Sequence, residues 1–118
     1  MAYRVLVIED NTDCRELFAM MVRHLGCEVL QADDGELGVQ KALSEKPDLI
    51  FMDIGMPNMN GMEAIREIKQ RRPDLPGVMV TAYVDDERRR RASELGAFEF
   101  ITKPVDFDQL KAQLRQLP

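Results

Sequence analysis

The sequence lacks the features that mark several classes of protein. Only two cysteines, Cys14 and Cys27, occur in 118 residues, which is too few for a disulfide scaffold. A zinc site through His24 and Cys27 would need a second pair of ligands, which the sequence does not offer. No apolar run approaches the roughly 18 residues that cross a bilayer. We therefore expect neither a disulfide-bonded nor a zinc-stabilised fold, and no membrane partner.

An excess of basic residues is missing as well. The 16 lysines and arginines are outnumbered by 21 aspartates and glutamates, and the net charge is −5. Sequence-independent binding to nucleic acid needs a basic surface. We therefore expect no direct binding to nucleic acid.

Signals for export and for further domains are also missing. Residues 1–4 lead directly into a strand-like segment with no visible signal peptide, so we expect a cytoplasmic protein. No internal repeat, low-complexity tract or linker interrupts the chain. The length suits one hydrophobic core, and we expect a single domain over residues 1–118.

What the sequence does contain is a regular alternation of apolar runs and segments of helical period. Some of the runs are nearly continuous in apolar residues, which is typical of strands buried on both faces of a parallel sheet. Strict alternation predicts an α/β fold with right-handed crossovers. Five strands in a chain of this length fit a doubly wound, flavodoxin-like sheet of order 2-1-3-4-5. The expected strands are Tyr3–Ile8, Cys27–Gln31, Leu49–Met52, Val78–Thr81 and Phe98–Ile101.

Apolar residues at helical spacing predict which helix faces meet the sheet. For the first helix the expected stripe is Cys14, Leu17, Phe18, Met21 and Leu25. For the last helix it is Phe107, Leu110, Leu114 and Leu117. Asn11 or Thr12 is expected to cap the first helix and Asp106 the last.

The helix expected at residues 85–95 has a thinner apolar stripe and four consecutive arginines, Arg88–Arg91. We interpret these arginines as a solvated face, with a surface for docking a partner as the alternative. The thin stripe predicts that this helix is held less firmly than the first one.

Polar residues follow the strands at one edge of the predicted sheet. Glu9 and Asp10 follow the first strand, Asp53 follows the third, Thr81 ends the fourth and Lys103 follows the fifth. Three neighbouring carboxylates repel one another, and a divalent cation such as Mg²⁺, which prefers oxygen ligands, relieves that repulsion. A cation, an ammonium and a hydroxyl around one carboxylate suit phosphoryl transfer, with Asp53 as the candidate nucleophile.

These motifs resemble those of the receiver domain of two-component response regulators, of the kind seen in the chemotaxis response regulator. The matching pieces are IED at 8–10, MDIGMPNMNG at 52–61, TA at 81–82 and FITKP at 100–104. They occur in the family's order, and the resemblance covers nearly the whole chain. The family's sheet has the strand order 2-1-3-4-5.

The resemblance implies a role for each residue at the site. Asp53 would be the phosphorylated aspartate. Glu9 and Asp10 would hold Mg²⁺ together with Asp53 and the main-chain carbonyl of Gly55. Thr81 and Lys103 would contact and sense the phosphoryl group, and Phe100 falls at the position of the switch aromatic.

The resemblance also implies partners. A histidine kinase or a histidine phosphotransfer protein would supply the phosphoryl group, and an unknown downstream protein would read the outcome. The output face would combine residues 85–95, the fifth strand and the last helix, and that face could also form a homodimer. The chain would catalyse only its own modification and would not be a turnover enzyme. We further expect a cis peptide between Lys103 and Pro104.

Two other functions use related features. A Mg²⁺-dependent phosphohydrolase also forms an aspartyl phosphate, but such enzymes typically place a second acid two residues after the nucleophile, where this chain has Gly55. A flavin-binding electron carrier of the same topology would want a phosphate loop after the first strand, where this chain has the acidic stretch EDNTDC.

Overall fold

The computed structural model describes residues 3–53, 61–81, 87, 90, 94, 99–102 and 105–117. Only the backbone is described for Gly61, Met62, Thr81, Glu99, Phe100 and Thr102. The strands are β1 (Arg4–Ile8), β2 (Glu28–Ala32), β3 (Leu49–Asp53), β4 (Gly77–Thr81) and β5 (Glu99–Thr102). The helices are α1 (Thr12–His24), α2 (Gly35–Ser44), α3 (Gly61–Arg71) and α5 (Phe107–Arg115).

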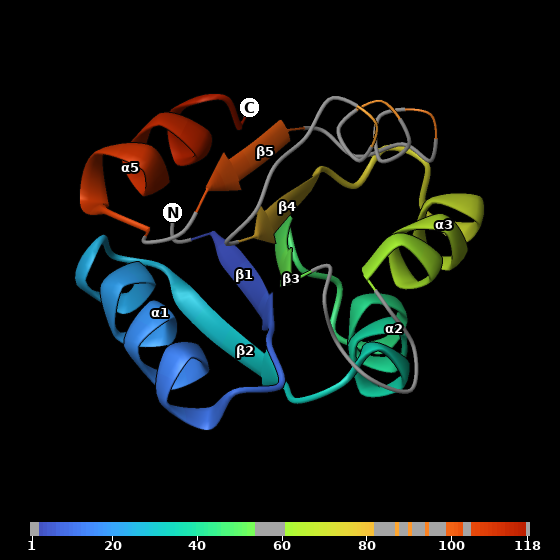
Figure 1. Cartoon of the computed structure of the whole chain (residues 1–118), viewed down its shortest axis with the longest axis horizontal. Helices are drawn as coiled ribbons and strands as arrows, with labels where there is room; N and C mark the ends of the chain where they lie inside the picture. The colour runs from blue at the N-terminus through green and yellow to red at the C-terminus, as the bar shows by residue number, and fades with distance from the viewer. Residues whose placement is uncertain are drawn as a thin grey trace.

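The five strands form one parallel sheet in the order β2-β1-β3-β4-β5, which confirms the predicted topology. Figure 1 shows α1 and α5 on one side of the sheet and α2 and α3 on the other. No helix among the described residues is long and apolar enough to cross a membrane.

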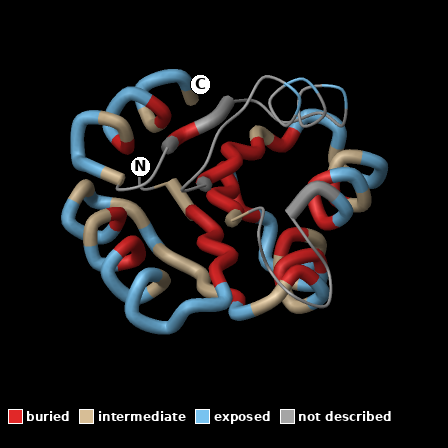
Figure 2. Tube along the Cα trace, in the orientation of Figure 1, coloured by how far each residue is buried: buried red, intermediate tan, exposed pale blue. Residues whose placement is uncertain are grey.

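Each face of the sheet has its own apolar core, because successive side chains of a strand point to opposite faces. On one face Leu6, Ile8, Ile50 and Met52 pack with α2 and α3. On the other, Val5, Val7, Leu49 and Phe51 pack with α1 and α5. Figure 2 shows the result, with β1, β3 and β4 buried and the outer sides of the helices exposed. Burial on both faces explains the nearly continuous apolar runs.

The apolar stripe expected for α1 is wrong in part. Leu17 is 59% exposed and Cys14 is also exposed, whereas Phe18, Ala19 and Val22 are buried. At about 100° per residue, Leu17 points away from the arc spanned by these three residues. The small side chain of Ala19 is fully buried, and the sequence prediction gave it no weight.

The last helix also departs from expectation at its start. Phe107 is 40% exposed, and its ring lies beside that of His24 with the centroids 5.4 Å apart. The buried residues of α5 are Leu110 and Gln113. This contact joins the end of α1 to the beginning of α5.

Side chains cap the helices where the sequence suggested. Asn11, rather than Thr12, accepts a hydrogen bond from the amide of Cys14 at the start of α1. Asp106 forms a capping box with Gln109, through reciprocal hydrogen bonds of 3.0 and 2.9 Å. Asp34 caps α2 by accepting a hydrogen bond of 2.8 Å from the amide of Leu37. The sequence analysis did not predict this cap.

Candidate functional site at the carboxyl edge of the sheet

Three carboxylates meet where β1 and β3 end. One oxygen from each of Glu9, Asp10 and Asp53 can be chosen so that the three atoms lie within 4.8 Å of one another. The register of the sheet explains this closeness, because the last pair between β1 and β3 is Ile8 with Met52. Glu9 and Asp53 each follow that pair directly.

Apolar residues lie directly beneath Glu9 and Asp53. Side chains alternate along a strand, so Glu9 shares a face with Val7 and Asp53 shares that face with Phe51. A small cavity of about 10 Å³ lies here, lined by Glu9, Asp53, Val7, Phe51 and neighbouring apolar residues. The carboxylates therefore have apolar core residues on their inner side, and Asp10 is exposed to solvent.

Burial is graded across the three acids. Glu9 is only 5% exposed, Asp53 is half-buried and Asp10 is exposed. An ionised group as buried as Glu9 needs polar partners or a counter-charge. One partner is the main-chain amide of Asn11, which donates to Oε2 of Glu9 at 3.4 Å. Asn11 thus caps α1 with its side chain and contacts the acidic group with its backbone.

The donor set fits a hard cation. It consists of carboxylate oxygens alone, without a histidine or cysteine in the group, and such oxygens suit Mg²⁺ rather than Zn²⁺. Three carboxylates this close repel one another unless a positive charge lies among them. Glu9, Asp10 and Asp53 are therefore brought together as the sequence predicted.

The structure bears less on the other predicted residues. The backbone of Thr81 ends β4 and pairs with Thr102, and that of Phe100 pairs with Met79; neither side chain is described. Gly55, Lys103 and the Lys103–Pro104 peptide lie outside the described residues, as do all four of Arg88–Arg91 except Arg90. Arg90 is helical and exposed, as are Glu87 and Glu94.

Sequence reasoning missed Arg15. This half-buried residue of α1 donates from Nη1 to the main-chain carbonyl of Glu9 at 3.0 Å. At about 100° per residue, Arg15 lies on the same side of α1 as the buried residues Ala19 and Val22. This spacing is the signal in the sequence that places Arg15 on the inner side of the helix.

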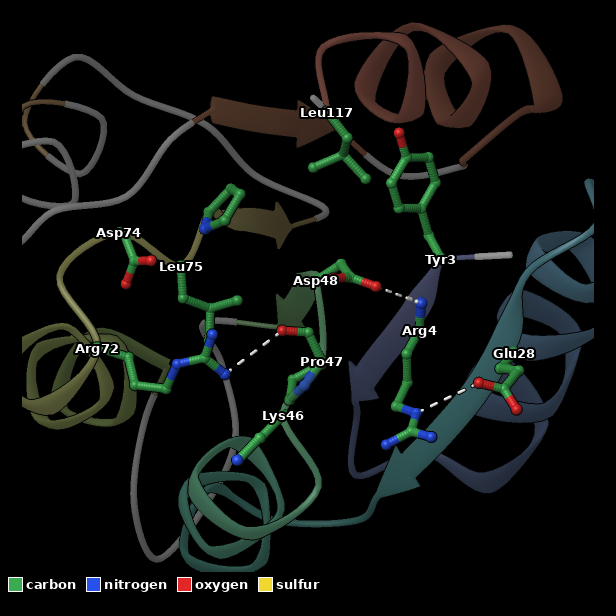
Figure 3. Close-up of a pocket in the computed structure, with 11 residues that line it drawn as sticks. Tyr3, Arg4, Glu28, Lys46, Pro47, Asp48, Arg72, Asp74, Leu75 and Leu117 are labelled. Atoms are coloured by element: carbon green, nitrogen blue, oxygen red, sulfur yellow. Dashed lines mark hydrogen bonds and ion pairs between the residues drawn. The ribbon is translucent and has the colours of Figure 1, made fainter. Parts of the chain in front are cut away.

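A much larger cavity, of about 720 Å³, lies at the opposite, amino-terminal edge of the sheet. Four of the charged residues that line it, Arg4, Glu28, Asp48 and Arg72, contact other residues of the protein (Figure 3). Arg4 donates from Nε to Glu28 at 3.3 Å and from its amide to Asp48 at 2.8 Å. Arg72 donates from Nη1 to the carbonyl of Pro47 at 3.5 Å. This cavity is remote from the three acids, so size alone does not locate the candidate site.

Comparison with known proteins identifies the family to which this chain belongs. The sequence model of the response regulator receiver domain matches residues 5–115. The phosphate regulon transcriptional regulatory protein PhoB of Escherichia coli is 34% identical over 98% of this chain and 51% of its own length. The chain spans about half the length, or less, of the first curated relatives it matches.

Solved structures share the fold over the whole chain. Chemotaxis protein CheY4 of Vibrio cholerae superposes with a TM-score of 0.94 and 25% identity, covering 100% of both chains. The receiver domain of sensor histidine kinase PA1611 of Pseudomonas aeruginosa gives a TM-score of 0.90 and 27% identity, covering 99% of this chain and 98% of that one. The latter structure holds a magnesium ion coordinated in its active site cleft.

Proposed function

The chain belongs to the receiver domains of two-component response regulators, a family of phosphorylation-activated switches, and we propose that Asp53 is its phosphoryl acceptor. The observation that carries the proposal is the meeting of Glu9, Asp10 and Asp53 at the carboxyl edge of the sheet. Asp53 ends β3, whose other four residues are buried, and a strand packed in this way holds a nucleophile in one place.

Mg²⁺ is the cofactor that this donor set supports. Glu9, Asp10 and Asp53 would hold it, together with the main-chain carbonyl of Gly55. When bound, Mg²⁺ supplies positive charge that offsets the negative charge of the transferring phosphoryl oxygens. The magnesium ion in the related receiver domain of PA1611 supports this choice.

The chemistry of Asp53 is a substitution at phosphorus. A carboxylate oxygen of Asp53 attacks the phosphorus of a phosphohistidine on a histidine kinase or phosphotransfer protein. The new O–P bond forms as the P–N bond breaks, and the imidazole nitrogen keeps the electron pair of that bond. Thr81 and Lys103 would contact the phosphoryl oxygens as donors of a hydrogen bond and a positive charge.

Output would follow from a shift between two conformations. Phe100 is the switch aromatic of this proposal. The signalling face combines residues 85–95, β5 and α5, and contacts either a downstream protein or a second copy of the chain. On this proposal the protein works in the cytoplasm, modifies only itself and does not turn over a substrate.

The test is labelling with a small phosphodonor in the presence of Mg²⁺, read by intact mass. Wild-type protein should gain one phosphoryl group and Asp53→Asn should gain none. Asp13→Asn is the matched control, because Asp13 is exposed in the first turn of α1 and lies outside the acidic group. Full labelling of Asp53→Asn would show that another residue is the phosphoryl acceptor.

A further inference from the structure

Arg15, near the start of α1, connects the ends of two strands through one guanidinium. Nη1 donates to the main-chain carbonyl oxygen of Glu9 at 3.0 Å, and Nε donates to Oε1 of Gln31 at 3.2 Å. Gln31 is held from α2 as well, because Lys41 donates to its main-chain carbonyl. The guanidinium is therefore fixed on one side by β2 and contacts the end of β1 with the other.

The carbonyl of Glu9 matters because it belongs to the peptide unit that leads into Asp10. A peptide unit is planar, so the oxygen of Glu9 and the nitrogen and Cα of Asp10 move as one body. The amide of Glu9 is already fixed by a hydrogen bond of 3.0 Å to the carbonyl of Ala32. With Arg15 on the carbonyl, both main-chain polar groups of Glu9 are held, and so is the direction in which the chain enters Asp10.

We propose that Arg15 is a positioning residue for metal binding, which orients Asp10 through the Glu9–Asp10 peptide without touching its carboxylate. This inference rests on the proposed function, since it takes Glu9, Asp10 and Asp53 as the residues that hold Mg²⁺. A hydrogen bond from a guanidinium is charge-assisted and stronger than a neutral one. Groups that hydrogen-bond to metal ligands without contacting the metal typically contribute roughly 10–100-fold to metal affinity.

Charge and geometry predict opposite effects of removing Arg15. A guanidinium close to the acidic group repels a cation, so loss of its charge alone would tighten Mg²⁺ binding. Loss of its hydrogen bond frees the peptide that carries Asp10, and Mg²⁺ binding then weakens. The sign of the change in Kd therefore separates the two effects.

The test is a calorimetric titration of Mg²⁺ into wild-type protein and three variants. We expect Kd to rise roughly tenfold in Arg15→Gln. The rise should be smaller in Arg15→Lys, which keeps the charge and one donor nitrogen but lacks the planar guanidinium with its several donor nitrogens. Arg23→Gln removes the same charge from an exposed position in the last turn of α1, and its Kd should not rise.

Urea unfolding of each variant shows that it is folded under the conditions of the titration, and Arg15→Lys alone decides the question if Arg15→Gln unfolds. An unchanged or lowered Kd in the Arg15 variants, with wild-type binding intact, overturns the role of Arg15 and leaves the proposed function standing. Absence of Mg²⁺ binding in the wild type overturns both.

Discussion

Gly38 in α2 lies directly against Ile8 at the end of β1. A Cβ atom at position 38 would lie 2.9 Å from Cγ1 and 3.2 Å from Cγ2 of Ile8, closer than ordinary van der Waals contact. Ile8 is 1% exposed and immediately precedes Glu9. The absence of a side chain at Gly38 therefore lets α2 pack closely on the strand that leads into the acidic group.

Replacing Gly38 by alanine should destabilise the protein although alanine is the better helix former. Helix propensity favours alanine by about 1 kcal/mol, whereas overpacking a buried side chain costs about 1–3 kcal/mol. Besides the terminal Cδ1 of Ile8, the added Cβ would crowd Cγ1 and Cγ2. These two atoms are bonded directly to Cβ and cannot turn away as a chain end can, so we expect a net loss of about 1 kcal/mol. Urea unfolding measures it.

Gly77→Ala provides the comparison for Gly38→Ala. The added Cβ there would crowd only the terminal Cδ1 of Ile65, while Cγ1 lies at 3.4 Å. The end of a side chain moves more easily than the atoms bonded to its Cβ, so the strain introduced should be smaller than at Gly38. A Gly38→Ala protein more stable than the wild type would contradict the close packing of α2 on β1.

Mg²⁺ should stabilise the folded protein through the acidic group. At a concentration about a hundred times its Kd, a ligand that binds only the folded state raises the free energy of unfolding by about 2.7 kcal/mol. Asp10→Asn should lose most of this gain, whereas Asp13→Asn should keep it. Without Mg²⁺, Asp10→Asn should be at least as stable as the wild type, because one of three neighbouring like charges has gone. Urea unfolding with and without Mg²⁺ tests both statements.

Gln113 should be replaceable by leucine at a gain in stability. The residue is 6% exposed, and its Oε1 has no hydrogen-bond partner within the part of the chain that the structure describes. A buried polar atom without a partner costs about 1–3 kcal/mol. We expect Gln113→Leu to raise the free energy of unfolding by about 1 kcal/mol. A loss of similar size would mean that the amide oxygen is hydrogen-bonded in solution.

The two cysteines should differ in their reaction with iodoacetamide. Burial, and secondarily the negative charge of Asp48, raises the pKa of the Cys27 thiol above 9.0. Because the thiolate is the nucleophile, a raised pKa leaves less of the reactive form at pH 8. Cys14 is exposed, so it should be alkylated first. Peptide mass spectrometry of a time course distinguishes the two sites.

The same pKa shift predicts a dependence of stability on pH. Above pH 9.0 the unfolded chain ionises Cys27 while the folded chain still holds the proton, so the folded state binds more protons. The contribution of Cys27 to stability is therefore complete below pH 9.0 and is lost as pH rises toward the folded-state pKa. Cys27→Ala should show a smaller alkaline loss of stability than Cys14→Ala.

The sheet and three acids of the site could be predicted because they depend on strong local patterns. Continuous apolar runs identify strands buried on both faces, and the carboxyl ends of parallel strands must meet at one edge. The predicted strands differ from the observed ones by about one residue at their ends, as for Leu49–Met52 against Leu49–Asp53, which is the usual uncertainty of element boundaries.

The helix faces and the hydrogen bond from Arg15 to the carbonyl of Glu9 could not be predicted in the same way. An apolar stripe gives weight to large residues such as Leu17, whereas the buried residues of α1 are Phe18, Ala19 and Val22. Arg15 lies on that inner side of the helix and contacts a carbonyl, which leaves no trace in an apolar pattern. Main-chain acceptors depend on the three-dimensional path of the chain.

The pairing of Ile8 with Met52 has a consequence for how this protein tolerates change. The two strands are aligned by four apolar residue pairs, from Val5 with Leu49 to Ile8 with Met52. This alignment sets the positions of Glu9 and Asp53, which directly follow the last pair. A slip of one residue would turn Asp53 to the opposite face of the sheet. Variation deep in the core can therefore alter the geometry of the three carboxylates while every residue of the acidic group stays the same.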